Sequence, residues 1–272
     1  MRSMNIAIRS MVASFFIMGA ESLGFAQFPE TVFLEEMTWM EVRDAIADGM
    51  TTAIIPTGGT EQNGPHMVLG KHNYLVRYKA GEIAKRLGDS LVAPVMAYVP
   101  EGGVSPVTGH MRFAGTITTP QSIFEQVLEY AARSLVQHGF IDIALIGDSG
   151  GNQAGQAAVA EALNLEWVDT TSRVHHVTAY YPGPGDDWLL RQGETSAAVG
   201  SHASIHDTAS LLFLNPSMLR LDRLSEGVTG DGTGLIGDAR RSTAEYGEQI
   251  LRMQIEAAVS QIRQFRMSAR NP

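Results

Sequence analysis

Three short polar segments of the sequence carry side chains that could do chemistry. The first contains Glu61, Asn63, His66 and His72, so that a carboxylate, an amide and two imidazoles lie within a dozen residues. Carboxylates and imidazoles bind divalent cations such as zinc or manganese, and they also transfer protons near neutral pH without a metal. The segment therefore predicts a metal site or an acid/base site, with a solvated surface loop as the simpler alternative.

The second segment, residues 147–152, follows an apolar run and contains Asp148 and Ser149. Its Gly-Asp-Ser-Gly-Gly order matches the nucleophile loop of trypsin-like serine proteases, but those proteins are all-β, whereas this chain alternates strands with helices. The Gly-x-Ser-x-Gly spacing of the α/β-hydrolases is also missing. We therefore reject a Ser149 nucleophile. Instead, Gly150 and Gly151 permit a tight turn whose backbone N–H groups would hold an anionic or carbonyl oxygen.

The third segment contains His202, His206 and Asp207 at the expected start of a helix. Asp207 could bind a metal or cap that helix, and both interpretations stay open. His206 has no partner that the sequence identifies. His110 lies in a separate glycine-rich segment, where it could contact a substrate or pack against a neighbouring subunit.

The elements that must position these segments follow from the apolar patterning. Apolar runs that read as strands alternate with helical patterns, which predicts one α/β domain with a mostly parallel sheet flanked by helices. Two of the polar segments follow strands, at the edge where such sheets bind ligands. The expected strands cover residues 52–55, 90–97, 141–146 and 174–180, and the expected helices cover 38–49, 74–87, 121–138, 153–165, 209–214 and 242–265.

Composition narrows the function further. The net charge of the 272-residue chain is −9 without a basic run, which argues against a nucleic-acid partner. Cysteine is absent, which excludes disulfides, a thiolate nucleophile and cysteine-ligated metals.

The N-terminal residues have the pattern of a secretory signal peptide. Arg2 and Arg9 accompany an apolar run at residues 11–20, and Gly24 and Ala26 place small residues before a cut ahead of Gln27. The run is too short to span a bilayer. We expect residues 1–26 to be removed, leaving a periplasmic or secreted domain of residues 27–272 without a membrane anchor. An uncleaved anchor helix is the alternative.

Four segments together resemble the creatininase (creatinine amidohydrolase) family, and the resemblance extends from about residue 39 to residue 262. They are residues 56–66, 109–116, 147–152 and 202–208. The resemblance implies a three-layer α/β fold, a homo-oligomer that is often a hexamer, and a divalent metal site, commonly of two ions. Such a site activates water against a cyclic amide or a related C–N bond.

The sequence departs from the family pattern at the metal ligands. The family's Glu-Gln-His-Gly keeps its glutamate as Glu61, but its histidine is Asn63. The aspartate of Leu-Gly-Thr-Asp is replaced by His72, and the histidine of Asn-Gly-His-Gly-Gly-Asn by Ser149. A carboxylate persists in the last segment as Asp207.

Two hypotheses follow from these departures. In the first, Glu61, His72, Asp148 and Asp207 form a rebuilt site for one zinc or manganese ion. In the second, the dinuclear site is lost, and the pocket binds a small polar molecule or works by acid/base catalysis through His66, His72 and Asp148.

The first hypothesis leads to a metal-dependent hydrolase of a cyclic amide, lactam or lactone-like small molecule, in which His66 or His72 handles protons. Creatinine itself is not the expected substrate, because the ligand set has diverged. A non-catalytic binding protein on the same scaffold is the alternative. The residues expected to contact the substrate are Asn63, His110, Ser149, Gly150, Gly151, Asn152 and His202.

Overall fold

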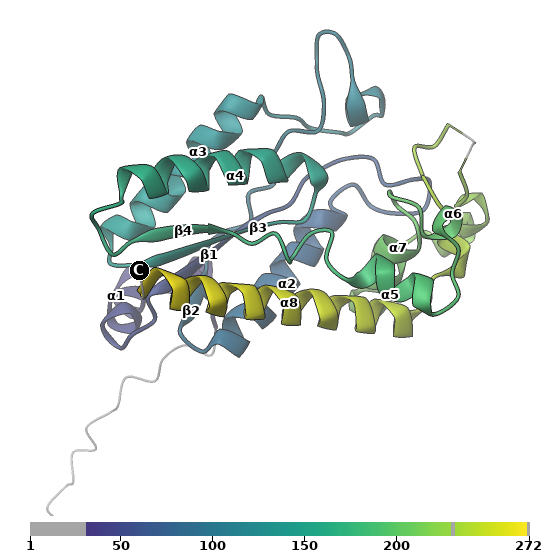
Figure 1. Ribbon diagram of the computed structural model, residues 1–272. Coiled ribbons are helices and arrows are strands. Elements are labelled where there is room, and N and C mark those ends of the chain that lie inside the picture. Colours follow the sequence, from purple (N-terminus) through teal and green to yellow (C-terminus); the bar gives the residue numbers. More distant parts are fainter. Residues whose placement is uncertain (1–30, 230–231, 271–272) are drawn as a thin grey trace, which may run out of the picture.

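A four-stranded parallel sheet forms the centre of the computed structural model, which describes residues 31–229 and 232–270 (Figure 1). The two central strands pair in register from Thr52 opposite Asp142 to Thr57 opposite Gly147. All six residues of each central strand are buried, as expected for apolar strands covered on both faces. The strand order is β2-β1-β3-β4, with β1 at Thr52–Thr57, β2 at Ser90–Val92, β3 at Asp142–Gly147 and β4 at Arg173–His176.

Helices cover both faces of the sheet, so that the predicted three-layer α/β architecture is confirmed (Figure 1). The helices are α1 Trp39–Ala47, α2 Lys71–Leu87, α3 Gln121–Gln137, α4 Gly150–Glu166, α5 Gly185–Arg191, α6 Ser196–Val199, α7 Ile205–Leu214 and α8 Ala244–Arg270. Because side chains alternate along a strand, Ile55 and Leu145 pack against α1, α3 and α4, whereas Ile54 and Ile146 pack against α2 and α8. Short 3₁₀ helices are η1 Leu34–Glu36, η2 Gly109–Arg112, η3 Pro216–Met218, η4 Leu221–Glu226 and η5 Ala239–Arg241.

Helices α5, α6 and α7 gather beside the first half of α8 (Figure 1). The contact between α7 and α8 depends on Gly247, because a Cβ at this position would lie 1.9 Å from the backbone oxygen of Ala209. This close approach brings the start of α7 to the same end of the molecule as the loops that follow β1 and β3.

Several boundaries differ from the sequence prediction for identifiable reasons. Strand β2 ends at Val92, two residues before Pro94, which has no N–H to continue the ladder. Helix α4 begins at Gly150 because the Ser149 hydroxyl accepts a hydrogen bond from the Gly151 N–H as an N-cap. Helix α2 begins at Lys71, three residues earlier than expected, and thereby carries Lys71 and His72 into its first turn.

The predicted signal peptide, residues 1–26, lies outside the described residues. Within the described part of the chain, none of the helices combines the length and the apolar character needed to cross a membrane.

Candidate active site

A cavity of about 520 Å³ lies beyond the carboxyl ends of β1 and β3. Its wall combines the loop after β1, the first turns of α2, α4 and α7, and the segment that precedes α3. Eight of the residues expected at the site line this cavity: Glu61, His72, His110, Ser149, Gly150, Gly151, His202 and Asp207.

Glycine in the loop after β1 makes room for the acidic side chains of the site. Gly59 has a φ of +156°, and a Cβ here would lie 2.2 Å from Oε1 of Glu101. The Asn73 side chain accepts a hydrogen bond from the Gly59 N–H and fixes the loop to α2. The glycine-rich sequence therefore allows two carboxyl groups, Glu61 and Glu101, to approach each other.

A buried chain of alternating charges runs from the cavity wall into the core. His72 Nε2 lies 2.8 Å from Glu61 Oε1, and His72 Nδ1 lies 3.0 Å from Asp148 Oδ2. Asp148 also accepts hydrogen bonds from Lys79 and from the Tyr180 hydroxyl. Both nitrogens of His72 thus face carboxylates, so the imidazole donates from both and acts as a cation.

The pKa values agree with these charges. Burial alone would raise the pKa of Asp148, but the charge of Lys79 and the hydrogen bond from His72 outweigh it and lower the pKa to about 2. Burial likewise opposes ionisation of Glu61, yet His72 holds the Glu61 pKa well below its ordinary value. For His72, burial and the charge of Lys71 lower the pKa, and the two carboxylates more than compensate and raise it.

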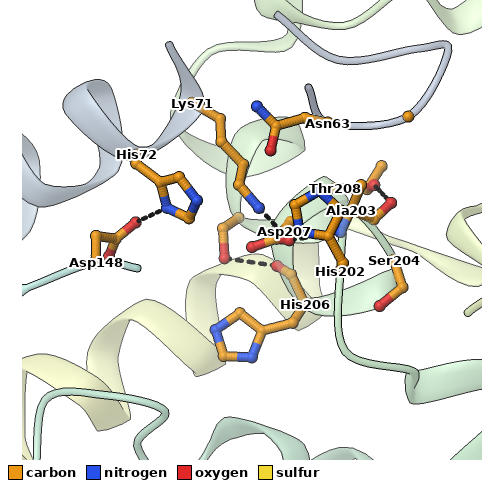
Figure 2. Close-up of polar contacts among 12 residues, drawn as sticks. Asn63, Lys71, His72, Asp148, His202, Ala203, Ser204, His206, Asp207 and Thr208 are labelled. Carbon is orange, nitrogen blue, oxygen red and sulfur yellow. Dashed lines mark hydrogen bonds and ion pairs between the residues drawn. The ribbon is translucent and has the colours of Figure 1, made fainter. Parts of the chain in front are cut away.

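Lys71 and His72 are adjacent in sequence but reach different carboxylates, as Figure 2 shows. Lys71 extends from the start of α2 to Asp207, and Asp207 also accepts a hydrogen bond from the Ala203 N–H. Burial would raise the pKa of Asp207, but the ammonium group of Lys71 holds it far below its usual range. The structure therefore pairs Asp207 with an internal cation and does not bring it together with His72 and Asp148.

Glu61, His110 and His202 form the group, among the described residues, whose donor atoms could share a metal ion. These atoms lie within 4.8 Å of one another. His110 Nε2 is 3.1 Å from Glu61 Oε2, and His202 Nδ1 is 3.8 Å from Glu61 Oε1. The two imidazole rings lie 4.6 Å apart at an angle of 36°.

Gln62 orients both imidazoles of this group. His202 Nε2 lies 2.8 Å from the Gln62 backbone oxygen and 3.0 Å from the Gln62 side-chain nitrogen. In the tautomer with the proton on Nε2, His202 donates to the backbone oxygen and keeps a lone pair on Nδ1, 3.8 Å from Glu61 Oε1. The Gln62 side-chain nitrogen lies 3.0 Å from His110 Nδ1. Burial lowers the pKa of His202 to about 4 and also lowers the pKa of His110, so both imidazoles are neutral at pH 7.

Besides Asp148, three expected site residues are buried outside the cavity wall. The Asn63 side-chain nitrogen donates to the backbone oxygens of Glu61, Val68 and Leu69, and Figure 2 shows Asn63 well away from His72 and Asp148. His66 Nε2 lies 2.8 Å from the Thr208 hydroxyl, and burial lowers the His66 pKa to about 4. Asn152 donates to Thr57 and to the Gly58 backbone oxygen. Contact of Asn63 and Asn152 with a substrate stays a prediction, as does proton transfer by His66.

Glu101 is a neutral carboxylic acid in this environment. Burial, together with the adjacent Glu61 carboxylate, raises the pKa of Glu101 to about 10. The unfolded chain releases this proton near pH 4.5, so the folded state holds one more proton between these values and loses stability as the pH rises.

We therefore expect Glu101→Gln to stabilise the chelator-treated protein, with a gain that grows from pH 5 to pH 8 and reaches at least ~1 kcal/mol. Glutamine keeps the shape and a hydrogen-bond donor but has no proton to lose. Urea unfolding at both pH values measures this gain, and exposed Glu245→Gln is the matched control. A gain that is absent or independent of pH would show that Glu101 is ionised in the folded protein.

The internal cations and the partner of His206 were not predicted from the sequence. Lys71 and Lys79 are eight residues apart on the buried face of α2, together with Leu75 and Ile83. This four-residue spacing on an apolar helix face was the signal that could have identified them. His206 pairs with Asp186, 2.7 Å away, on the cavity wall, and no local pattern connects these two residues.

The sequence of this chain matches a known protein family. The family described as creatinine amidohydrolase matches residues 35–262. The creatinine amidohydrolase of Pseudomonas putida is 22% identical over 86% of this chain and 97% of its own length. The mycofactocin precursor peptide peptidase of Mycolicibacterium smegmatis is 27% identical over 78% of this chain and 84% of its own length.

Solved creatininase structures share the fold. One described with manganese has a TM-score of 0.71 and 21% identity, and covers 86% of this chain and 98% of its own. Another, described as a Zn–Zn type, has the same TM-score and identity and covers 87% and 98%. With its family match spanning most of the sequence, the chain belongs to the creatininase (creatinine amidohydrolase) family, whose characterised members are hydrolases.

Proposed function

We propose that the protein hydrolyses an amide C–N bond of a small molecule or short peptide, with one divalent ion held by Glu61, His110 and His202. The observation that carries this proposal is the convergence of these three side chains on the cavity wall. Both relatives are named for the cleavage of such bonds, one as an amidohydrolase and one as a peptidase. The substrate class therefore includes peptides as well as the cyclic amides expected from the sequence.

The donor atoms fit one zinc or manganese ion. Two ligands that each lie ~2.1 Å from a tetrahedral ion are about 3.4 Å apart. His110 Nε2 lies 3.1 Å from Glu61 Oε2 and His202 Nδ1 lies 3.8 Å from Glu61 Oε1, and the three donor atoms lie within 4.8 Å of one another, so small side-chain shifts reach this spacing. The neutral imidazole of His202 with a backbone acceptor behind it, the neutral imidazole of His110 and the carboxylate of Glu61 would form the ligand set.

Internal cations support one ion rather than two. His72 already lies between Glu61 and Asp148, and Lys71 already pairs with Asp207. Asp148 also pairs with Lys79. Of the three carboxylates Glu61, Asp148 and Asp207, we therefore assign only Glu61 to a metal ion.

The side chains of the site divide the remaining work. When bound, the ion would polarise the amide carbonyl and lower the pKa of a water molecule. His72 positions Glu61 through its hydrogen bond, and the neutral carboxyl of Glu101 can donate a proton to a leaving amine. On the same cavity wall, Asp186 can accept from His206 Nδ1, which leaves a lone pair on Nε2 to take up a proton.

A test combines metal analysis with turnover. We expect the purified protein to contain one zinc or manganese ion per chain, and to lose amine release from its substrate after dialysis against a chelator. Regain of activity on adding back zinc or manganese, across a panel of cyclic amides, lactams and dipeptides, would identify the class. His202→Ala should lower metal content at least ~10-fold, whereas His138→Ala, an exposed histidine, should not.

One observation favours a second candidate, a binding protein without catalysis. Glu61, Asp148 and Asp207 are already balanced by Lys71, His72 and Lys79, so the site needs no metal to neutralise its buried charge. Absence of any stoichiometric divalent ion, with no turnover across the panel, would support this candidate and refute the hydrolase.

A further inference from the structure

Two buried lysines on α2 differ in how fully their ammonium groups are bonded. Lys79 donates to Asp148 and Gln254, and its nitrogen lies 4.5 Å from the centre of the Tyr180 ring. Lys71 is equally buried, with 1% of its side chain exposed, yet its nitrogen has one hydrogen-bond partner among the described residues, Asp207. An ammonium group carries three donors, so Lys71 keeps two for other acceptors.

The position of Lys71 indicates what those donors are for. Lys71 lines the cavity, whereas Lys79 does not. A buried N–H of a charged group without an acceptor is costly, and a ligand oxygen in the cavity would remove that cost.

A second feature of the cavity wall favours an electron-rich oxygen. Gly150 and Gly151 form the first turn of the 17-residue helix α4 and line the same cavity. The N-terminus of a helix carries partial positive charge, and here the Gly151 N–H is already bonded to the Ser149 hydroxyl. The ammonium group of Lys71 and the positive end of this helix thus line the same cavity.

We propose that Lys71 is a substrate-binding residue that donates hydrogen bonds to a carboxylate or carbonyl oxygen of the ligand. Its pairing with Asp207 holds the amine in place and leaves its remaining donors directed at the cavity. If the protein hydrolyses amides as proposed above, this oxygen is the carbonyl oxygen of the scissile bond and becomes a carboxylate oxygen in the product. The oxygen site itself does not depend on that reaction.

The test compares two probes that differ in one group. N-acetylglycine carries a carboxylate, and N-acetylglycinamide carries a neutral amide in its place. We expect the chelator-treated wild-type protein to bind the carboxylate at least ~10-fold more tightly, since a hydrogen bond between charged partners is the stronger one. Chelator is present so that a metal ion does not contribute, and titration is followed by ligand-observed NMR.

The variants assign the preference to Lys71. Lys71→Met keeps the length of the side chain and should bind both probes equally, whereas exposed Lys85→Met should keep the preference. Because Lys71→Met leaves Asp207 without its cation, the double variant Lys71→Met/Asp207→Asn, which removes both charges, guards against misfolding. It should also bind both probes equally, while circular dichroism and the melting temperature report its fold.

Two results would overturn the inference: no preference for N-acetylglycine in the wild-type protein, or an undiminished preference in the double variant. A wild-type preference that Lys71→Met abolishes, in a protein without turnover, would support the oxygen site and refute the hydrolase alone. Turnover without any preference for N-acetylglycine would refute the oxygen site and support the hydrolase.

Discussion

Glu61→Gln is expected to lower the affinity of the protein for zinc or manganese by at least ~100-fold, because it removes the anionic ligand of the proposed site. Glutamine preserves the shape of the side chain and can still accept the hydrogen bond from His72, so the fold should persist. Isothermal titration with zinc measures the affinity, and the metal content of the purified variant gives an independent value.

The matched control for this change is Asp186→Asn. Asp186 is another carboxylate on the cavity wall, but it pairs with His206 and is not one of the three proposed ligands. This variant should bind zinc within a few-fold of wild type. Unchanged zinc affinity in Glu61→Gln would rule out the Glu61, His110 and His202 site.

Asp148→Ala is expected to destabilise the fold by about 3–5 kcal/mol, the range for removing one partner of a buried ion pair. Asp148 is 5% exposed and accepts hydrogen bonds from Lys79, His72 and Tyr180. Its loss removes one acceptor from each of two buried cations and the carboxylate that accepts from the buried Tyr180 hydroxyl. Urea unfolding at pH 7 measures the change in the free energy of unfolding.

Two further variants show how much of that change comes from losing a buried acceptor. Asp148→Asn keeps one acceptor oxygen and should cost less than alanine. Asp44→Ala removes a carboxylate from the exposed pair with Arg43 and should cost less than ~1 kcal/mol. A cost below ~1 kcal/mol for Asp148→Ala would mean that water or a rearranged side chain replaces the carboxylate.

The architecture was predictable because it follows from local patterns. Mostly apolar strands at residues 52–55 and 141–146, separated by helical patterns, predict parallel strands covered on both faces, and β1 and β3 have that arrangement. The strand ends in turn place the segments of Glu61 and Ser149 at one edge of the sheet.

The edges of the elements were less predictable, since short-range hydrogen bonds decide them. Ser149 was expected to contact the substrate, and the structure shows it also as the N-cap that starts α4 at Gly150. The expected second strand continued to residue 97, whereas the ladder of β2 ends before Pro94.

The sequence by itself determined the fold and the segments that reach the cavity, because the periodicity of strands and helices is a local property. It also determined the family, because the order of the motifs can be read directly along the chain. Only the tertiary structure decided which charges meet. His72 was expected as a metal ligand, and the fold places it between Glu61 and Asp148 with both nitrogens engaged. His110 and His202 approach Glu61 from distant parts of the chain. Their pairing depends on how loops from different strands pack over the sheet, and no sequence period encodes that packing.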